Sequence, residues 1–469
     1  MNDSAKPSTL SIIKFVVMSL IGIFLFMVPL PVWNEVDGEM VRTFNIPLGI
    51  ALNWLGTTIN SVEFNGFGLL VFIATLIITF SFIVSLATLI FKPAFIIENE
   101  KLSRLFLSAP VYLVSKGVAF VIAWMVFLGI GPGWLIDPWV GGEFMLVRLI
   151  ASNGGLIAIF LIVGLAIPIL TDFGLMEFLG TLIRKFVRAL FTLPGRSSID
   201  LFGSWFSSSA AGVIITRDQH EKGYYTHREA SAICVNFELV SLPFTFVVAS
   251  QIGLTQYFAI FYLIICVTAI LLAMVMPRIW PLRGFKDEYL PEVGKQIEEV
   301  VPENISTARW ALNSAGNRAA KTGVKDVAKS GISNWLNIFM DLIPVILAWG
   351  AVAIIVEAHT PIFDWLSWPF GRLLELLRVT DGAEYAPATV VGFIDMFIPA
   401  LLIGDAPKDT RFILGALSIV QIIYLAETGI LILKSKMPLR IWHLAILFVM
   451  RTLFALPIIV LLTRLLFRV

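Results

Sequence analysis

The stretch IDLFGSWFSSSAAGVIITRDQH, residues 199–220, lies between two long apolar runs and decides how the chain is interpreted. It carries Asp200 and four serines, Ser204 and Ser207 to Ser209, within about three helical turns. Of the 469 residues, 58% are hydrophobic and 14% are charged, whereas a soluble domain has about 25% charged residues. Apolar runs close to the roughly 20 residues that span a bilayer recur along the chain. The sequence therefore predicts an all-α polytopic membrane protein with a polar interruption at this stretch.

The hydropathy pattern predicts about nine transmembrane helices, and the loop charges constrain how they connect. The crossings are 11–33, 67–91, 107–130, 144–170, 231–250, 256–276, 335–357, 411–433 and 441–463, while 46–60, 198–216 and 387–404 are short, polar or broken. Loops rich in Lys and Arg belong on the cytoplasmic side. Residues 34–66 carry four acids against one arginine and are placed outside, whereas residues 277–334 hold nine Lys and Arg and are placed inside. These sides agree only if 198–216 enters the membrane and returns, as a re-entrant or broken helix.

The chain also repeats itself at a constant offset. Gly203 and Gly392 are 392 − 203 = 189 residues apart, and Glu238 and Glu427 are 427 − 238 = 189 residues apart. Each repeat reads crossing, re-entrant segment, crossing, crossing, so the second repeat is upside down relative to the first. Inverted repeats with broken helices are typical of secondary transporters. The predicted segments are N-terminal transmembrane helices at 1–142, gate repeat 1 at 143–276, a cytoplasmic polar linker at 277–334 and gate repeat 2 at 335–469.

Opposite loop charges support the inversion, and amphipathic stretches precede each re-entrant segment. Residues 172–229 carry seven Lys and Arg, whereas residues 358–410 carry three against seven acids. Residues 173–196 and 362–380 place basic side chains on one helical face and apolar side chains on the other, which predicts helices lying in the membrane interface.

Ionisable residues inside a membrane are rare, costly and functional by default. A buried carboxylate favours its neutral form, which makes proton coupling feasible. The predicted substrate- or ion-binding residues are Glu238, Glu427, Asn236, Asp200, Ser207, Ser208, Ser209, Asp395 and Gln421. The alternative for the glutamates is a protonated side chain that only joins two helices. The alternative for the serines is tight helix packing, in which each hydroxyl bonds its own backbone.

Other chemistries have little support in the sequence. The net charge of +1 argues against nucleic acid as a partner. No HExxH or CxxC motif predicts a metal site, no GxxxxGK[ST] motif predicts nucleotide hydrolysis, and no GxSxG motif predicts a serine hydrolase. His220 and His227 lie in a charged segment, RDQHEKGYYTHRE, and are expected to be solvated. We therefore expect a protein that is not an enzyme and has no cofactor or metal.

Three runs carry a resemblance to a known family. They are LVRLIASNGGLIAIFLIVGLAIPILTDFG, LPGRSSIDLFGSWFSSSAAGVIITRDQ and REASAICVNFELVSLPF, and they resemble the YjiH-like inner-membrane proteins with their gate, or nucleoside-recognition, domain. Similar gate domains occur in concentrative nucleoside transporters, the ferrous-iron transporter and spore-maturation membrane proteins. The resemblance covers most of the chain, most specifically about 143–250. It implies a bacterial inner-membrane location, an inverted-repeat core and transport, without fixing the solute. The GTP-binding domain of the iron transporter is absent, which speaks against iron.

Two functional hypotheses from different classes follow. The first is a secondary transporter for a small polar solute, nucleoside-like in one version, coupled to H⁺ or Na⁺. The second is a non-transporting membrane scaffold that docks another protein through 277–334. A weaker third idea is a lipid-linked substrate that moves along the amphipathic stretch. Gate-domain relatives often pair, which suggests a homodimer in the lipid bilayer.

Overall fold

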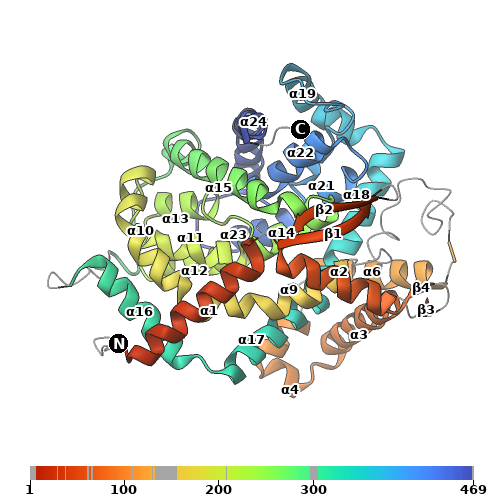
Figure 1. The fold of residues 1–469 in the computed structure, drawn as a ribbon. Helices are drawn as coiled ribbons and strands as arrows, with labels where there is room; N and C mark the ends of the chain where they lie inside the picture. The colour runs from red at the N-terminus through yellow and green to blue at the C-terminus, as the bar shows by residue number, and fades with distance from the viewer. Residues whose placement is uncertain are drawn as a thin grey trace. The chain divides into compact units, whose positions relative to one another are not determined.

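The structure is a computed structural model, and it divides into two compact units. It describes residues 7–28, 30–36, 39–60, 63–64, 67–106, 110–128, 130–131, 156–206, 209–295 and 305–466. Unit 1 contains Met1–Ile46, Ala166–Val327 and Leu366–Val469, and unit 2 contains Pro47–Leu165 and Ala328–Trp365. Each unit therefore combines segments that are far apart in the sequence (Figure 1).

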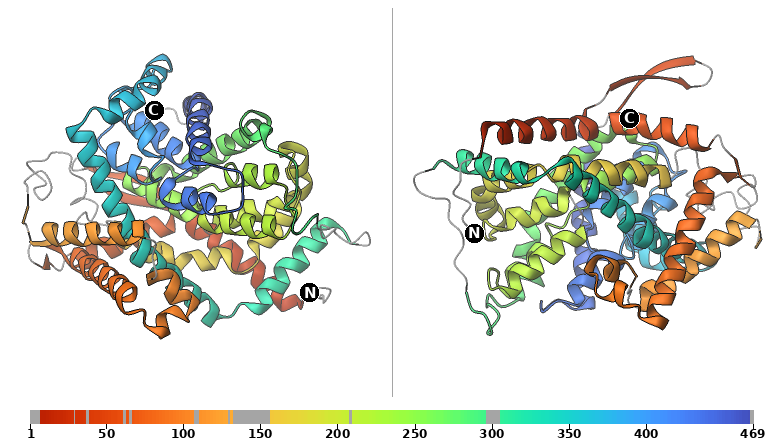
Figure 2. Two further views of the ribbon diagram at one scale, coloured as in Figure 1. Left: turned by 180° about the vertical axis from the view of Figure 1, so that it is seen from behind. Right: turned by 90° about the horizontal axis from the view of Figure 1, so that it is seen from below.

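Unit 2 is a helical bundle around α3 and α6. Its elements are α2 (Pro47–Asn60), β3 (Glu63–Phe64), β4 (Phe67–Gly68), α3 (Leu69–Phe91), α4 (Ala94–Ile97), α5 (Glu100–Phe106), α6 (Pro110–Leu128), η4 (Ile338–Leu342) and α18 (Ile343–His359). Helix α6 packs against both α3 and α18, and the paired helices α3 and α6 are visible in both views of Figure 2. The side chains of Ile96, Leu105, Phe106 and Met340 form a buried core.

Unit 1 holds the remaining helices and one hairpin. Its elements are α1 (Thr9–Met27), β1 (Leu30–Val36), β2 (Glu39–Asn45), α10 (Leu175–Phe191), α11 (Ser197–Phe206), α12 (Ser209–Glu221), α13 (His227–Cys234), α14 (Leu242–Gln251), η1 (Thr255–Tyr257), α15 (Phe258–Val275), η2 (Met276–Arg278), η3 (Leu282–Gly284), α16 (Thr307–Lys321), α20 (Ala388–Val391), α21 (Ile398–Leu402), α22 (Lys408–Val420), η5 (Leu425–Gly429), α23 (Ile430–Leu433) and α24 (Ile441–Leu466). Helices α9 (Leu156–Thr171), α17 (Val324–Asn337) and α19 (Ile362–Leu376) run across the unit boundaries. Strands β1 and β2 pair antiparallel, from Leu30 opposite Asn45 to Val36 opposite Glu39.

The long apolar helices confirm the all-α polytopic class. Among the described residues, six helices are long and apolar enough to cross a membrane, and a bent pair makes up to seven. The six are Thr9–Met27, Phe72–Phe91, Thr255–Gly284, Val324–Glu357, Lys408–Leu433 and Ile441–Leu466, and each overlaps a predicted crossing. The pair Ile162–Thr171 and Leu175–Phe191 bends by 56°, and it covers the end of the predicted crossing 144–170, whose first residues lie outside the described part.

Several predicted crossings differ from the structure in their limits or continuity, among them 411–433, in which α22 ends at Val420 and η5 begins at Leu425. The prediction of an uninterrupted crossing at 231–250 is wrong, because the helix stops at Cys234 and restarts at Leu242. Ser241 caps the restart by accepting from the Phe244 N–H, and Pro243 occupies the first turn, where a missing N–H costs nothing. The predicted crossing 11–33 also ends early, since α1 stops at Met27 and strand β1 follows.

The bend between α9 and α10 depends on a glycine. Gly174 has φ +99°, and a Cβ there would lie 2.6 Å from the carbonyl oxygen of Ala315 in α16. The left-handed backbone and the close approach both require glycine. Phe15, Phe173, Ala315 and Ala319 form the core where α1, α10 and α16 meet. The apolar face of the linker helix α16 is therefore already buried within unit 1.

The helices of the two predicted repeats begin at closely matched positions. Adding 189 to Ser209, the first residue of α12, gives Ile398, the first residue of α21. The same shift carries Leu156 of α9 to position 345, beside the start of α18 at Ile343. It carries Leu175 of α10 to position 364, beside the start of α19 at Ile362. The offset thus matches the starts of these three helices, whereas the start of α13 at His227 maps to position 416, inside α22.

Candidate functional site

The polar stretch that interrupts the apolar chain folds into a helical hairpin. Helices α11 and α12 pack against each other with matched contacts: Thr216 beside Asp200, and Gly212 beside Ser204. The positions along α11 rise as those along α12 fall, so the two helices are antiparallel. The chain therefore reverses direction between the end of α11 at Phe206 and the start of α12 at Ser209, as the prediction of a re-entrant or broken helix requires. Ser207 and Ser208 themselves lie outside the described residues, and Ser209 is buried at the start of α12.

Two carboxylates meet inside this hairpin. Asp200 on α11 and Glu238 are 1% and 0% exposed. The hydroxyl oxygen of Thr216 on α12 lies 3.3 Å from Asp200 Oδ2 and 3.2 Å from Glu238 Oε1, within hydrogen-bond reach of both. We call Asp200, Thr216 and Glu238 the carboxylate cluster. The sequence predicted both acids but did not predict that one threonine would join them.

Glu238 lies in the interruption between α13 and α14, which we call the first break (residues 235–241). Ser204 donates to the Phe237 carbonyl at 2.7 Å and holds the break against α11. The other carboxylate oxygen, Glu238 Oε2, is buried and has no hydrogen-bond partner. It fills the space left by Gly212, where a Cβ would be only 1.5 Å away. A glycine on α12 is therefore what allows the carboxylate to sit here.

Asn236, in the same break, accepts a hydrogen bond from Arg451, a residue that the sequence analysis missed. Arg451 on α24 is fully buried and donates to the Asn236 Oδ1 at 2.8 Å and to the Val235 carbonyl at 2.9 Å. It also donates twice to the Val420 carbonyl, from Nε at 3.1 Å and from Nη2 at 2.8 Å. Val235 directly follows α13, and Val420 is the last residue of α22. Both carbonyls therefore lie at helix C-termini, which carry partial negative charge. Arg451 thus joins the ends of two helices that belong to different predicted repeats.

Gln421 follows Val420 in the second break, residues 421–424, where α22 ends and the chain continues non-helically. Its amide nitrogen donates to the Thr389 carbonyl at 2.8 Å and to the Thr452 hydroxyl at 2.9 Å. Its amide oxygen is buried without a partner and lies where a Cβ on Gly392 would be 2.3 Å away. The backbone at Ile422 has φ +64°, a left-handed conformation that β-branched residues rarely adopt.

The remaining predicted site residues lie near the second break. Glu427 is half-buried in η5, the segment that follows the break. The N–H groups of Leu425 and Ala426 donate to the carbonyls of Phe393 and Ile394, so η5 is tied to the interruption between α20 and α21. Asp395 is 1% exposed and accepts from the Phe397 N–H at 2.8 Å at the start of α21. In the structure Asp395 therefore stabilises a local turn.

Helix α12 contacts the elements that carry both predicted glutamates. Gly212 lies against Glu238, and η5, with Glu427, packs on α12. Of the nine predicted site residues, Asp200 and Glu238 meet through Thr216. Asn236 and Gln421 lie at the two chain breaks that Arg451 joins. The intramembrane-charge rule that selected the glutamates also applied to Arg451, in the predicted crossing 441–463, and to Lys116, in 107–130. Lys116 is 0% exposed and donates to the Leu105 carbonyl at 2.8 Å and to Ser85 at 3.1 Å.

The prediction of a solvated His220 is wrong. Its ring is 0% exposed, and Nδ1 lies 2.9 Å from the Tyr225 carbonyl, which can only accept, so Nδ1 carries the proton. Burial lowers the pKa of His220 below its usual 6.5, and the neighbouring His227 and Lys436 act in the same direction. His227 is partly buried, with its ring centroid 4.9 Å from that of His220.

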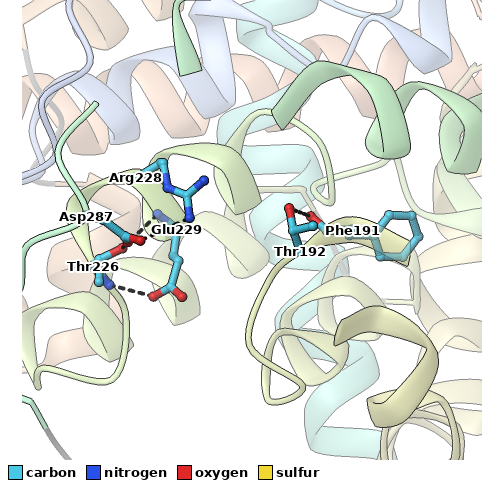
Figure 3. Close-up of polar contacts among 6 residues, drawn as sticks. All are labelled: Phe191, Thr192, Thr226, Arg228, Glu229 and Asp287. Atoms are coloured by element: carbon cyan, nitrogen blue, oxygen red, sulfur yellow. Dashed lines mark hydrogen bonds and ion pairs between the residues drawn. The ribbon is translucent and has the colours of Figure 1, made fainter. Parts of the chain in front are cut away.

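The turn before α13 is fastened to the segment that follows α15 (Figure 3). Thr226 donates from its hydroxyl to Asp287 at 2.7 Å, and Arg228 forms an ion pair with Asp287 at 3.1 Å. Glu229 accepts from the Thr226 N–H in a capping box, although burial raises the pKa of Glu229 above its usual 4.5. The first residues of the predicted linker are therefore attached to the gate region.

Comparison with known proteins agrees with this architecture. A family model described as Gate, nucleoside recognition, matches residues 155–255, which include the helical hairpin and the first break. An uncharacterized protein of Alkalihalophilus pseudofirmus is 40% identical over 465 residues, covering 98% of this chain and 96% of that protein. The chain belongs to this family of gate-domain membrane proteins. No solved structure matches it significantly.

The gate domain and the apolar helices together suggest a membrane protein of the transporter type rather than an enzyme. They also suggest a multi-pass membrane location and a small solute as the partner. Among the described residues, no group of three or more His, Cys, Asp or Glu could hold a metal ion.

Proposed function

We propose that this gate-domain protein is a secondary transporter that moves a small polar solute across the bacterial inner membrane, coupled to H⁺ or Na⁺. One observation carries the proposal: two interrupted helices, from segments related by the 189-residue offset, are joined at a buried arginine, and the first break also carries the buried carboxylate of Glu238. Interrupted helices whose ends point at a common polar site are how secondary transporters bind solutes and ions.

The burial of these groups favours a functional site over simple packing. Burying a charged or polar group is costly unless hydrogen bonds offset the cost. Glu238 Oε2 and Gln421 Oε1 are both buried without a partner, each in space left by a glycine. A hydrogen-bonding solute or an ion could supply what these oxygens lack when the breaks open. We propose Glu238, Glu427, Asn236, Asp200, Ser207, Ser208, Ser209, Asp395 and Gln421 as the lining residues, with Arg451 and Thr216 added.

The two predicted gate repeats, 143–276 and 335–469, would be inverted in the membrane. The 189-residue correspondence of helix starts supports this part of the proposal. The gate family's nucleoside-recognition description makes nucleosides the first solutes to test. The scaffold alternative is less well supported, because the alanine face of the linker helix α16 already packs on α1 and α10.

A thermal-shift screen of the purified protein tests the proposal. Nucleosides, nucleobases, amino acids, small organic acids and monovalent cations would be added at two pH values. A ligand that binds only the folded state stabilises it, by about 2.7 kcal/mol at a concentration of 100 Kd. We expect at least one solute to raise the melting temperature of the wild type and of Glu384→Gln, an exposed control.

The same shift should be lost in Glu238→Gln and reduced in Glu427→Gln. If no solute or ion shifts the wild type and both variants melt like it, the transporter proposal is contradicted. The scaffold hypothesis, with a partner on the polar face of α16, would then replace it.

A further inference from the structure

We propose that the carboxylate cluster holds one proton, on Glu238, and that the coupling ion of the transporter is therefore H⁺ and not Na⁺. This inference rests on the proposed function for its role in coupling, whereas the proton itself is inferred from the hydrogen-bond geometry together with the charges around the two acids.

The hydroxyl of Thr216 has a single hydrogen but faces two carboxyl oxygens. It lies 3.3 Å from Asp200 Oδ2 and 3.2 Å from Glu238 Oε1. A hydroxyl donates one hydrogen bond and can accept others, whereas an ionised carboxylate can only accept. If both acids were ionised, they would have to share the single Thr216 hydrogen in one weak three-centre bond. Each contact is a full hydrogen bond of its own when one carboxyl group is protonated and donates to Thr216.

The other donors near Glu238 are already engaged. The hydroxyl of Ser204 lies beside Glu238, but it donates to backbone carbonyls, 2.7 Å from Phe237 O and 3.0 Å from Leu201 O. Glu238 Oε2 has no partner and is fully buried against Gly212. An ionised Glu238 would thus be a fully buried charge whose one remaining donor, Thr216, also faces Asp200, which is unfavourable.

Asp200 is as deeply buried as Glu238, but it has more neighbours that favour its charged form. The Tyr225 hydroxyl faces its carboxylate, and the Arg196 guanidinium provides a favourable charge interaction. Glu238 instead faces the Asp200 charge, and two like charges sharing a site rarely ionise together. The Cys234 thiol, also beside Thr216 and both acids, is a neutral group at neutral pH.

The resulting chain of bonds has one direction. Glu238 donates from Oε1 to Thr216 Oγ1, and Thr216 donates to Asp200 Oδ2. When the first break opens to water, Glu238 can release its proton, and no atom other than that proton needs to leave. A Na⁺ ion would require both acids ionised and several oxygens directed at one point, whereas Thr216 occupies the space between the two acids.

Infrared difference spectroscopy of the purified full-length protein tests this inference without any transport assay. At neutral pH most carboxyl groups are ionised, because their ordinary pKa values lie near 4. We expect the spectrum of the wild type minus that of Asp200→Asn/Glu238→Gln to show a protonated carboxyl band, of about one group per chain. The band should shift in deuterated buffer and in Thr216→Val. Asp395→Asn serves as the matched control, because it removes another buried acid from outside the cluster.

Two outcomes would overturn the inference. One is a cluster with no protonated carboxyl band until the pH is well below neutral. The other is a band that disappears when Na⁺ replaces choline at constant pH, which would show that Na⁺ displaces the proton. Because the band reports the proton directly, a failed solute screen would contradict the transporter proposal and leave this result standing.

Discussion

The two chain breaks occupy related places in the sequence, but they differ in the polar side chains that they carry and in how these side chains are buried. The first break carries an acid, Glu238, which is completely buried and reaches a second acid through Thr216. The second break carries an amide, Gln421, and its carboxylate, Glu427, is displaced into η5 and half-buried. The N–H groups of Leu425 and Ala426, at the start of η5, donate to the carbonyls of residues 393 and 394. Under the proposed function, the first break would carry the titrating acid and the second break would carry an uncharged amide.

Arg451 connects the two breaks, so its loss should have the largest effect. Arg451→Met leaves the carbonyls of Val235 and Val420 and the amide of Asn236 without donors, and an unsatisfied buried group costs about 1–3 kcal/mol. We expect a loss of roughly 3 kcal/mol in the free energy of unfolding, measured by denaturant titration in detergent. Arg451→Lys should be intermediate, because one ammonium cannot reach both breaks.

The control for this prediction lies on the same helix. Arg464 also donates to backbone carbonyls, of Leu377 and Arg378, but these bonds are exposed. Arg464→Met should therefore cost much less than Arg451→Met. Equal losses for the two variants would contradict the view that Arg451 holds the breaks together.

Glycine replacements compare the two breaks directly. In Gly212→Ala the new Cβ would meet Glu238 Oε2 at 1.5 Å, and overpacking of this kind costs about 1–3 kcal/mol. Gly392→Ala would meet Gln421 Oε1 at 2.3 Å, a milder contact, so we expect a smaller loss of melting temperature. Gly203→Ala, which meets only the end of the Ile215 side chain at 3.1 Å, is the control and should be near neutral.

Shortening the acid should relieve the first of these clashes. Gly212→Ala/Glu238→Ala should melt closer to the wild type than Gly212→Ala does, since the two shortest contacts, with the Glu238 carboxyl group, are gone and only the Ser204 Cβ at 2.9 Å remains. An additive loss in the double variant would mean that Gly212 serves helix packing and not the carboxylate.

His220 near the end of α12 and Asp409 at the start of α22 are related by the same offset but differ in burial, and a smaller effect of pH follows. The first repeat has buried His220, whereas the same offset leads to Asp409 in the second, a partly exposed residue that accepts from Thr380. The pKa of His220 is lowered by burial, so the unfolded state binds the proton more tightly. Stability should therefore fall as the pH drops through 6.5 toward the folded-state pKa, and be unaffected at higher pH.

His220→Asn keeps a donor for the Tyr225 carbonyl but cannot titrate. Melting temperatures between pH 8 and pH 5 should therefore show a shallower loss for this variant than for the wild type. Parallel curves for the two proteins would show that His220 does not contribute to the acid sensitivity.

Much of the topology could be predicted from hydropathy alone. The six long helices and the folded-back hairpin follow from apolar length and from loop charge, which act locally. The first break could not be seen in this way, because Phe237, Leu239 and Val240 are as apolar as a continuous span. Pro243 after Ser241 was the available signal, typical of a helix start, and it was outweighed by the hydrophobicity of the segment.

The sequence pointed to the acids of the candidate site, but not to the residues that contact them or that join the two breaks. Asp200 and Glu238 were found because charge in an apolar segment is conspicuous. Thr216 was missed because threonine is unremarkable in a helix until the fold places two acids beside it. Arg451 was visible as an intramembrane charge, but its partners are carbonyls 31 and 216 residues away, which no local pattern reveals.

The most direct test of the account is the accessibility of Cys234, which is fully buried beside the carboxylate cluster. In proteoliposomes, with Cys266 replaced by Ala, a membrane-impermeant thiol reagent would be applied from each side in turn. We predict that Cys234 reacts several-fold faster than the protein unfolds, and that a solute found in the thermal-shift screen changes the rate. Labelling only at the rate of unfolding, whatever solute is present, would contradict the claim that the breaks open to admit a solute.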